Sequence, residues 1–145
     1  MFQLKPVQIM RNYEAVVLLD STCTEDEQKN IFRKSRDVIK SFSGEINHID
    51  TWGRRNLANA INKQKSAVYF HLTFKAQPGA VAELERTMRI NDKVLRFMHT
   101  KLDDRKSLAE HLQEYRDVLT ESVNRERERE ARFQKKRAAR ARPMN

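Results

Sequence analysis

Basic side chains placed beside aromatic or turn-forming residues are the part of this sequence best suited to chemistry. Arg54 and Arg55 directly follow Trp52 and Gly53, and further cations lie near the expected ends of secondary-structure elements. A guanidinium group offers a planar fork of N–H donors that fits phosphate, and it stacks on bases. Each cation alone is compatible with a solvated surface residue, but together they predict one patch that contacts a polyanion. The cations concerned are Arg54, Arg55, Lys63, Lys65, Arg86, Arg89, Lys93 and Arg96.

Residue types that carry catalysis or bind metals are present but are not arranged for either. The four histidines form no H-E-x-x-H motif and no i,i+4 pair within one helix, and Cys23 is the single cysteine. A lone thiol makes neither an internal disulfide nor a cysteine-rich zinc site, and is by default an inert buried side chain. The phosphate-binding patterns G-x-G-x-x-G and G-x-x-x-x-G-K-[ST] are also absent. We therefore expect no enzymatic activity, no metal, no cofactor and no small-molecule substrate.

The composition is that of a small, basic protein with a modest core. The 145 residues carry a formal net charge of +9, with 39% hydrophobic and 34% charged residues. The hydrophobic fraction is lower and the charged fraction is higher than in a typical globular protein, so part of the chain is expected to be solvated. The longest apolar run, residues 15–19, is too short to cross a bilayer, and no secretory leader is evident. We expect one domain with an appendage, no membrane contact, a reducing compartment and a polyanionic partner.

The C-terminal segment 125–145 concentrates the positive charge, with nine basic against three acidic side chains. It has one aromatic residue and no apolar periodicity, so it cannot fold as a packed unit by itself. Its residues are good helix formers, and two Glu–Arg pairs, Glu121–Arg125 and Glu128–Arg132, have i,i+4 spacing. Two interpretations stay open: a solvated charged helix or tail, or an arm that orders on RNA. In the second, Lys135, Lys136 and Arg137 are candidate contacts.

Apolar periodicity predicts the elements that must position these side chains. Strands are expected over 13–19, 45–55, 67–74 and 94–101, and helices over 24–43 and 80–89. Thr24 to Glu27 reads as a capping box, and Gly44 occupies the place of a helix C-terminal glycine. Residues 56–66 are expected to form a loop, and the irregular apolar spacing of 45–55 indicates a bulge or a longer strand. The order β-α-β-β-α-β predicts an α+β, ferredoxin-like split βαβ fold, with a four-stranded antiparallel sheet and two helices on one face.

A third helix is expected to begin near Ser107, because apolar residues recur there at helical spacing. The stripe comprises Leu108, Leu112, Tyr115, Leu119 and Val123. We favour docking of this stripe on the domain over a separate partner surface, since amphipathic helices usually pack locally.

Two separated segments resemble the bacterial small-subunit ribosomal protein six family. Residues 52–63 (WGRRNLANAINK) resemble its W-G-R-R-x-L-A-Y-P-I-x-K segment, and 88–98 (MRINDKVLRFM) its second signature, (F/L)-R-(F/I)-x-D-x-V-x-R-x-M. Residues 10–14 (MRNYE) match the usual family opening, which makes 1–9 an extra leader or an upstream start codon assigned in error. Asn59-Ala60 stands in place of Tyr-Pro, so a ring and a rigid turn are missing. The resulting division is a leader (1–9), a ferredoxin-like ribosomal domain (10–103), and a C-terminal amphipathic helix with a basic tail (104–145).

The resemblance implies a structural protein of the cytoplasmic ribosome rather than an enzyme. Family members bind the central domain of the small-subunit (16S) rRNA as a heterodimer with small-subunit ribosomal protein eighteen. By carry-over, Arg54, Arg55 and Lys63 are the first candidates for RNA or partner contact, followed by Arg89 and Arg96 from the second motif. The family's tails differ widely, so the third helix and tail inherit no function from it.

Two other functions compatible with this topology fit the residues less well. A non-ribosomal module of the RNA-recognition-motif type needs aromatics on its third strand in a pattern that residues 65–72 match poorly. A ferredoxin-like hydrolase such as an acylphosphatase needs a phosphate-cradling loop after the first strand. Residues 20–24 contain no Gly and begin with Asp20, whose charge would repel phosphate.

Overall fold

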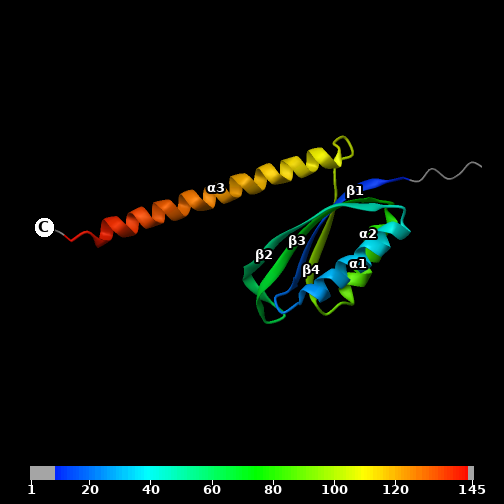
Figure 1. Cartoon of the computed structure of the whole chain (residues 1–145), viewed down its shortest axis with the longest axis horizontal. Helices are drawn as coiled ribbons and strands as arrows, with labels where there is room; N and C mark the ends of the chain where they lie inside the picture. Colours follow the sequence, from blue (N-terminus) through cyan, green and yellow to red (C-terminus); the bar gives the residue numbers. More distant parts are fainter. Residues whose placement is uncertain (1–8, 144–145) are drawn as a thin grey trace, which may run out of the picture. The chain divides into compact units, whose positions relative to one another are not determined.

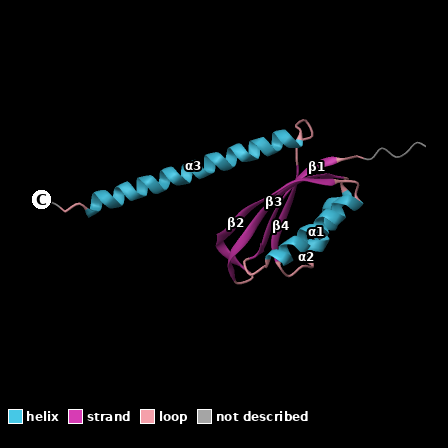
Figure 2. Cartoon of the chain, in the orientation of Figure 1, coloured by secondary structure: helices cyan, strands magenta, loops and turns pink. Residues whose placement is uncertain are grey.

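The computed structural model describes residues 9–143, which form a four-stranded antiparallel sheet, two helices on one of its faces and a long C-terminal helix (Figures 1 and 2). The elements are β1 (Arg11–Asp20), α1 (Glu25–Ser41), β2 (Glu45–Ile61), β3 (Gln64–Ala76), α2 (Gly79–Arg89), β4 (Val94–Lys101) and α3 (Leu108–Ala141). The strand order is β2-β3-β1-β4. The predicted ferredoxin-like arrangement is thereby confirmed.

The chain divides into two compact units, one up to Leu108 and one from Ala109 onward. The predicted boundary between 103 and 104 lies nearby and stays a prediction. Residues 1–8 of the predicted leader lie outside the described residues.

The core is built on the alternation of β1. Tyr13, Ala15, Val17 and Leu19 are buried beneath the two helices, at 6% exposure or less. Their partners on β3 are Phe74, Leu72, Phe70 and Val68, which form the apolar face expected from the period of two. β1 therefore directs one face of the sheet to α1 and α2, and its alternate residues lie on the opposite face.

α1 begins as the sequence predicts, but it ends at Ser41, two residues before the predicted end. Thr24 Oγ1 accepts from the Glu27 N–H, and the Glu27 carboxylate accepts from the Thr24 N–H, so the capping box is confirmed. At the other end Ser43, not Gly44, adopts the left-handed conformation, with φ of 60°. The Ser43 N–H donates to the Lys40 carbonyl and the Gly44 N–H to the Ile39 carbonyl, the two bonds of a Schellman motif.

Gly44 is required for a different reason than the one expected from the sequence. An added Cβ would overlap the Lys75 carbonyl oxygen and would lie 2.7 Å from the Ala76 Cβ. The glycine therefore permits β3 to pass close to the end of α1.

The predicted loop over 56–66 is wrong, because β2 and β3 form a long hairpin there. β2 continues to Ile61, which pairs with Gln64 across a two-residue turn. Asn62 and Lys63 have φ values of 48° and 63°, as the central residues of a type I′ turn require. Register shifts after Ile46, Thr51 and Asn56 explain the irregular apolar spacing as bulges in a strand longer than expected.

α3 is a single helix in which no residue is buried. An Arg125–Glu121 ion pair confirms one of the two expected i,i+4 contacts. The helical form of the charged tail is thus present, while docking of the apolar stripe stays a prediction. No helix among residues 9–143 is long and apolar enough to span a membrane.

Substituting Gly44→Ala should lower the free energy of unfolding by about 2–3 kcal/mol, because backbone atoms block the new methyl group. Gly79→Ala is the matched control. Its Cβ meets the Phe42 ring at 2.8 Å, and that side chain can shift, so the loss should stay within about 1 kcal/mol. Urea unfolding monitored by circular dichroism measures both. Equal stability of the two variants would contradict the close approach at Gly44.

Candidate RNA and partner interface

The first two candidate residues, Arg54 and Arg55, point to opposite faces of the sheet because side chains alternate along β2. Arg54 lies opposite Val68, on the helix-covered side, and its Nη2 donates to the Ser21 carbonyl at 2.9 Å. It therefore ties β2 to the turn after β1. Arg55 lies opposite Ala67 on the side of the sheet away from the helices α1 and α2, where it is exposed and makes no ion pair among residues 9–143. Of the two, Arg55 has its full set of donors available.

The face of the sheet opposite α1 and α2 carries a cluster of rings built on Trp52. The Trp52 ring stacks on Tyr69 with centroids 5.9 Å apart, and on His71 at 6.1 Å. His71 Nε2 lies 3.2 Å from Glu14 Oε2, and the His71 side chain is only 3% exposed. With the neighbouring aliphatic side chains these rings form what we call the open-face patch. Its members are Val16, Leu18, Trp52, Tyr69, His71 and Met98.

Two candidate cations border the open-face patch from opposite edges of the sheet. One residue from each strand forms a row across the sheet, in which neighbours are cross-strand partners: Arg96 on β4, Leu18 on β1, Tyr69 on β3 and Gly53 on β2. Arg96 therefore lies in the same cross-strand row as the Tyr69 ring, and Arg55 lies two residues beyond that row on β2. Arg96 is exposed and makes no ion pair with any described residue. The structure thus brings Arg55, Arg96 and an apolar, aromatic surface onto one face.

The remaining candidates on the sheet domain are placed apart from this face. Lys63 is exposed at the tip of the β2–β3 hairpin. Arg89, at the end of α2, lies over the Phe97 ring at 5.7 Å and 3.8 Å from the Glu85 carboxylate. Arg89 therefore belongs to the helix side, and part of its charge is satisfied within the domain.

The three tail candidates, Lys135, Lys136 and Arg137, are exposed on α3 in the second unit. Successive residues of a helix point in different directions, so the three cannot all face one surface.

The turn after β1 is not shaped to hold a phosphate. Asp20 accepts hydrogen bonds from the backbone N–H and hydroxyl of Thr22, at 2.9 and 2.8 Å, and these bonds lower the pKa of its carboxyl. The carboxyl thus stays ionised and repels anions. Burial raises the pKa of the nearby Cys23 thiol, which disfavours the nucleophilic thiolate. Among the described residues no three His, Cys, Asp or Glu side chains gather as a potential metal site.

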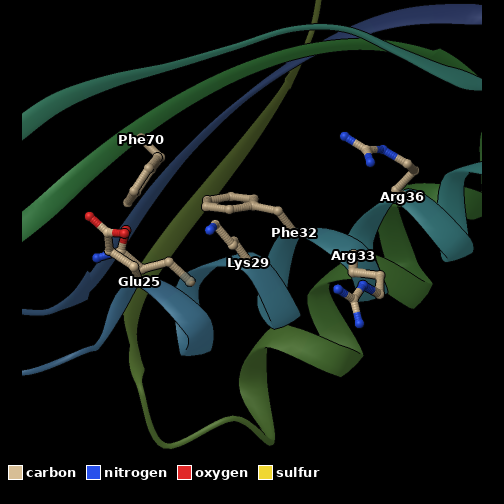
Figure 3. A pocket seen from close by; sticks show the side chains of 7 residues that line it. Glu25, Lys29, Phe32, Arg33, Arg36 and Phe70 are labelled. Atoms are coloured by element: carbon tan, nitrogen blue, oxygen red, sulfur yellow. The ribbon is translucent and has the colours of Figure 1, made fainter.

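One basic surface of the structure was not predicted from the sequence. It runs along α1, where a pocket of about 410 Å³ lies between the helix and β3. Figure 3 shows the Phe32 and Phe70 rings close together, with Lys29 and Arg36 two turns apart on α1. Four cations, Lys29, Arg33, Arg36 and Lys40, recur at positions i, i+4, i+7 and i+11 of the predicted helix. This spacing is visible in the sequence.

Comparison with known proteins decides the family. The profile described as "Ribosomal protein S6" matches residues 12–101, from β1 to the end of β4. The small ribosomal subunit protein bS6 of Bdellovibrio bacteriovorus is 53% identical over 115 residues, which cover 79% of this chain and 76% of that protein. The chain belongs to the ribosomal protein S6 family.

Other members of the S6 family agree with this assignment. The bS6 protein of Trichlorobacter lovleyi is 40% identical over 95 residues, covering 66% of this chain and 78% of that protein. The crystal structure of 30S ribosomal protein S6 from Thermotoga maritima superposes with a TM-score of 0.60 at 20% identity, covering 77% of this chain and 99% of that one. The likeness in structure supports the S6 fold, and the family resemblance inferred from residues 52–63 and 88–98 is confirmed.

Arg54→Ala should lower the free energy of unfolding by about 1 kcal/mol, because it removes the hydrogen bond to the Ser21 carbonyl. Arg55→Ala, which removes an exposed side chain without an ion pair, should change it by less than about 0.5 kcal/mol. Urea unfolding of the two variants beside the unchanged chain measures the difference. If Arg55→Ala proves the more destabilising, the assignment of the structural contact to Arg54 is wrong.

Proposed function

We propose that this S6-family chain is a structural, non-enzymatic component of the small ribosomal subunit in the cytoplasm. In this role it binds the central domain of the 16S rRNA together with small-subunit ribosomal protein eighteen. The observation that carries the proposal is the open-face patch, an aromatic and aliphatic surface on the face of the sheet opposite α1 and α2, bordered by Arg55 and Arg96. A surface of this kind suits a macromolecular partner better than a small ligand, because it is a broad sheet face.

The apolar part of the open-face patch is assigned to the protein partner. Met98 is 58% exposed, and the Trp52 ring lies flat against Tyr69 and His71 instead of standing free. Burying such a surface against another protein releases water from apolar groups, and aromatic residues and Met are enriched at protein interfaces. Arg55 and Arg96 at its rim are placed to select the orientation of the partner and of nearby RNA.

The RNA contact is assigned to cations that are exposed and make no ion pair among the described residues. Arg55 on β2 and Lys63 at the hairpin tip meet this condition, and Arg96 extends the set on the other edge of the sheet. Each can displace a condensed counterion from a phosphate, so binding should weaken steeply with salt. Folded RNA offers few readable base edges, so selectivity would come from its shape and from the bound protein partner.

The function is tested by binding of the full chain to a central-domain fragment of 16S rRNA, with purified ribosomal protein eighteen present. Arg55→Ala with Lys63→Ala should weaken binding about tenfold and reduce the slope of log K against log salt by about one or more. Lys34→Ala with Lys75→Ala removes the same charge from exposed positions outside the proposed interface and is the matched control. The readout is a filter-binding or anisotropy titration at several salt concentrations.

The proposal is contradicted if the unchanged chain fails to bind the fragment at low salt with the partner present. If the two double variants lose the same affinity, the named contacts are wrong, although ribosomal binding itself is supported. Sedimentation of the tagged chain through a sucrose gradient gives an independent readout, since a ribosomal component co-migrates with the small subunit after a moderate salt wash.

Deleting residues 125–145 tests whether the charged end of α3 is an RNA arm. Contact by Lys135, Lys136 or Arg137 predicts that the truncated chain loses affinity for the same fragment and that its salt slope falls by about one per lost phosphate contact. None of the deleted residues that the structure describes is buried, so the sheet domain should keep its stability. An unchanged slope would identify the segment as a solvated helix.

A further inference from the structure

A groove runs along the side of α1 that faces the β2 edge of the sheet. Its first part is the pocket of about 410 Å³ floored by Phe32 and Phe70, and its second, of about 420 Å³, lies between α1 and residues 45–49 of β2. Arg36 lines both parts and joins them. Each volume lies within the range of about 300–1,000 Å³ that is usual for pockets that hold a small organic group.

The wall of this groove on α1 is a stripe of cations. Lys29 and Arg33 line the first part and Lys40 the second, with Arg36 shared. All four are exposed, and none makes an ion pair with any residue from 9 to 143. Over the eleven residues from first to last, α1 rises about 16 Å, enough to follow several phosphates of a nucleic-acid strand.

The charges along the stripe are biased to one sign. Lys29 and Arg33, and again Arg36 and Lys40, are like charges at i,i+4 spacing, which repel, while Glu25 and Asp37 lie at the same spacing from Lys29 and Arg33. The carboxylates of α1 cluster in its first turn, where only Glu25 borders the groove, and Asp37 lines neither part. A polyanion in the groove would relieve this repulsion.

The floor of the groove adds an aromatic surface to the charge. The Phe32 and Phe70 rings lie 4.7 Å apart between centroids, and Phe70 is buried while Phe32 is half-buried. Figure 3 shows the Phe32 ring projecting from α1 between Lys29 and Arg36. Proteins that bind single-stranded nucleic acid combine cations with aromatic rings in this way. The phosphates contact the cations, and a base stacks on the ring.

We infer that the α1 groove binds a single-stranded segment of RNA, with its phosphates on Lys29, Arg33, Arg36 and Lys40 and one unstacked base against Phe32. This inference rests on the proposed ribosomal function but concerns a different surface. The open-face patch is on the side of the sheet opposite α1 and α2, while the groove is on the side that α1 covers. The chain therefore has two RNA-facing surfaces, one shared with the protein partner and one on α1.

The test is fluorescence anisotropy of a labelled twelve-nucleotide oligouridine titrated with the full chain over a salt series. Lys29→Gln with Arg36→Gln should weaken binding about tenfold and lower the salt slope by about 1.4, the value for two lost single-strand contacts. Lys34→Gln with Lys75→Gln lowers the net charge equally at exposed positions that line neither part of the groove. This control should lose less than threefold and keep its slope. Circular dichroism verifies that both variants are folded.

Equal losses in the two double variants would overturn the groove assignment. Failure of the unchanged chain to bind oligouridine at low salt would overturn it as well. Binding of the central-domain fragment with ribosomal protein eighteen, measured in parallel, reports on the proposed function separately. If the unchanged chain binds the fragment but the two double variants lose equal affinity for oligouridine, the ribosomal function is supported and only the groove assignment is wrong.

Discussion

Burial of one face of β1 beneath α1 and α2 is the constraint on which the rest of the sheet domain depends. β1 is flanked by β3 and β4, so its alternation sets the register of both neighbours. Val17 and Leu19 are fully buried on one side, which leaves Val16 and Leu18 on the other. A shift of one residue would exchange the two faces. The same alternation therefore builds the core and the open-face patch.

The core also explains which polar groups are free to contact a partner. His99 lies on the buried face between Phe74 and Phe97, where burial lowers the pKa of its imidazole although Glu85, 3.5 Å away, opposes the shift. A neutral ring is compatible with that apolar surrounding. Asp20 and Glu27 are likewise occupied by turn and cap contacts. The charges left over are mostly cations on β2, the hairpin tip and α1, so the domain presents a basic surface to solvent.

Most of the secondary structure could be predicted from the sequence, because its elements are stabilised by burying one face, and the spacing of apolar residues shows which face is buried. The alternation through Phe70 and the capping box at Thr24 predicted β3 and the start of α1 correctly. The end of β2 could not be predicted, because residues 56–61 are held by backbone pairing and a turn at Asn62 without glycine. The cations were predicted to form one patch, but the structure places Arg54 and Arg89 on the helix side and Arg55 and Arg96 on the opposite face. For the two residues of β2, this separation depends on alternation and on register shifts that the sequence does not reveal. The α1 groove needs β2 and the helix together, a tertiary juxtaposition that no local pattern specifies.

β2 lies at the edge of the sheet, with β3 on one side only. A long free edge of this kind is a template onto which a second chain can add its own strand, the first step of many aggregates. Three register shifts break the row of backbone donors along β2, and Arg54 and Arg55 place two positive charges at its middle. Two copies approaching edge to edge would bring these charges together. One of these two charges, Arg55, is also a residue proposed to bind RNA, so the same side chain would oppose edge-to-edge pairing in a chain that has not yet met its RNA.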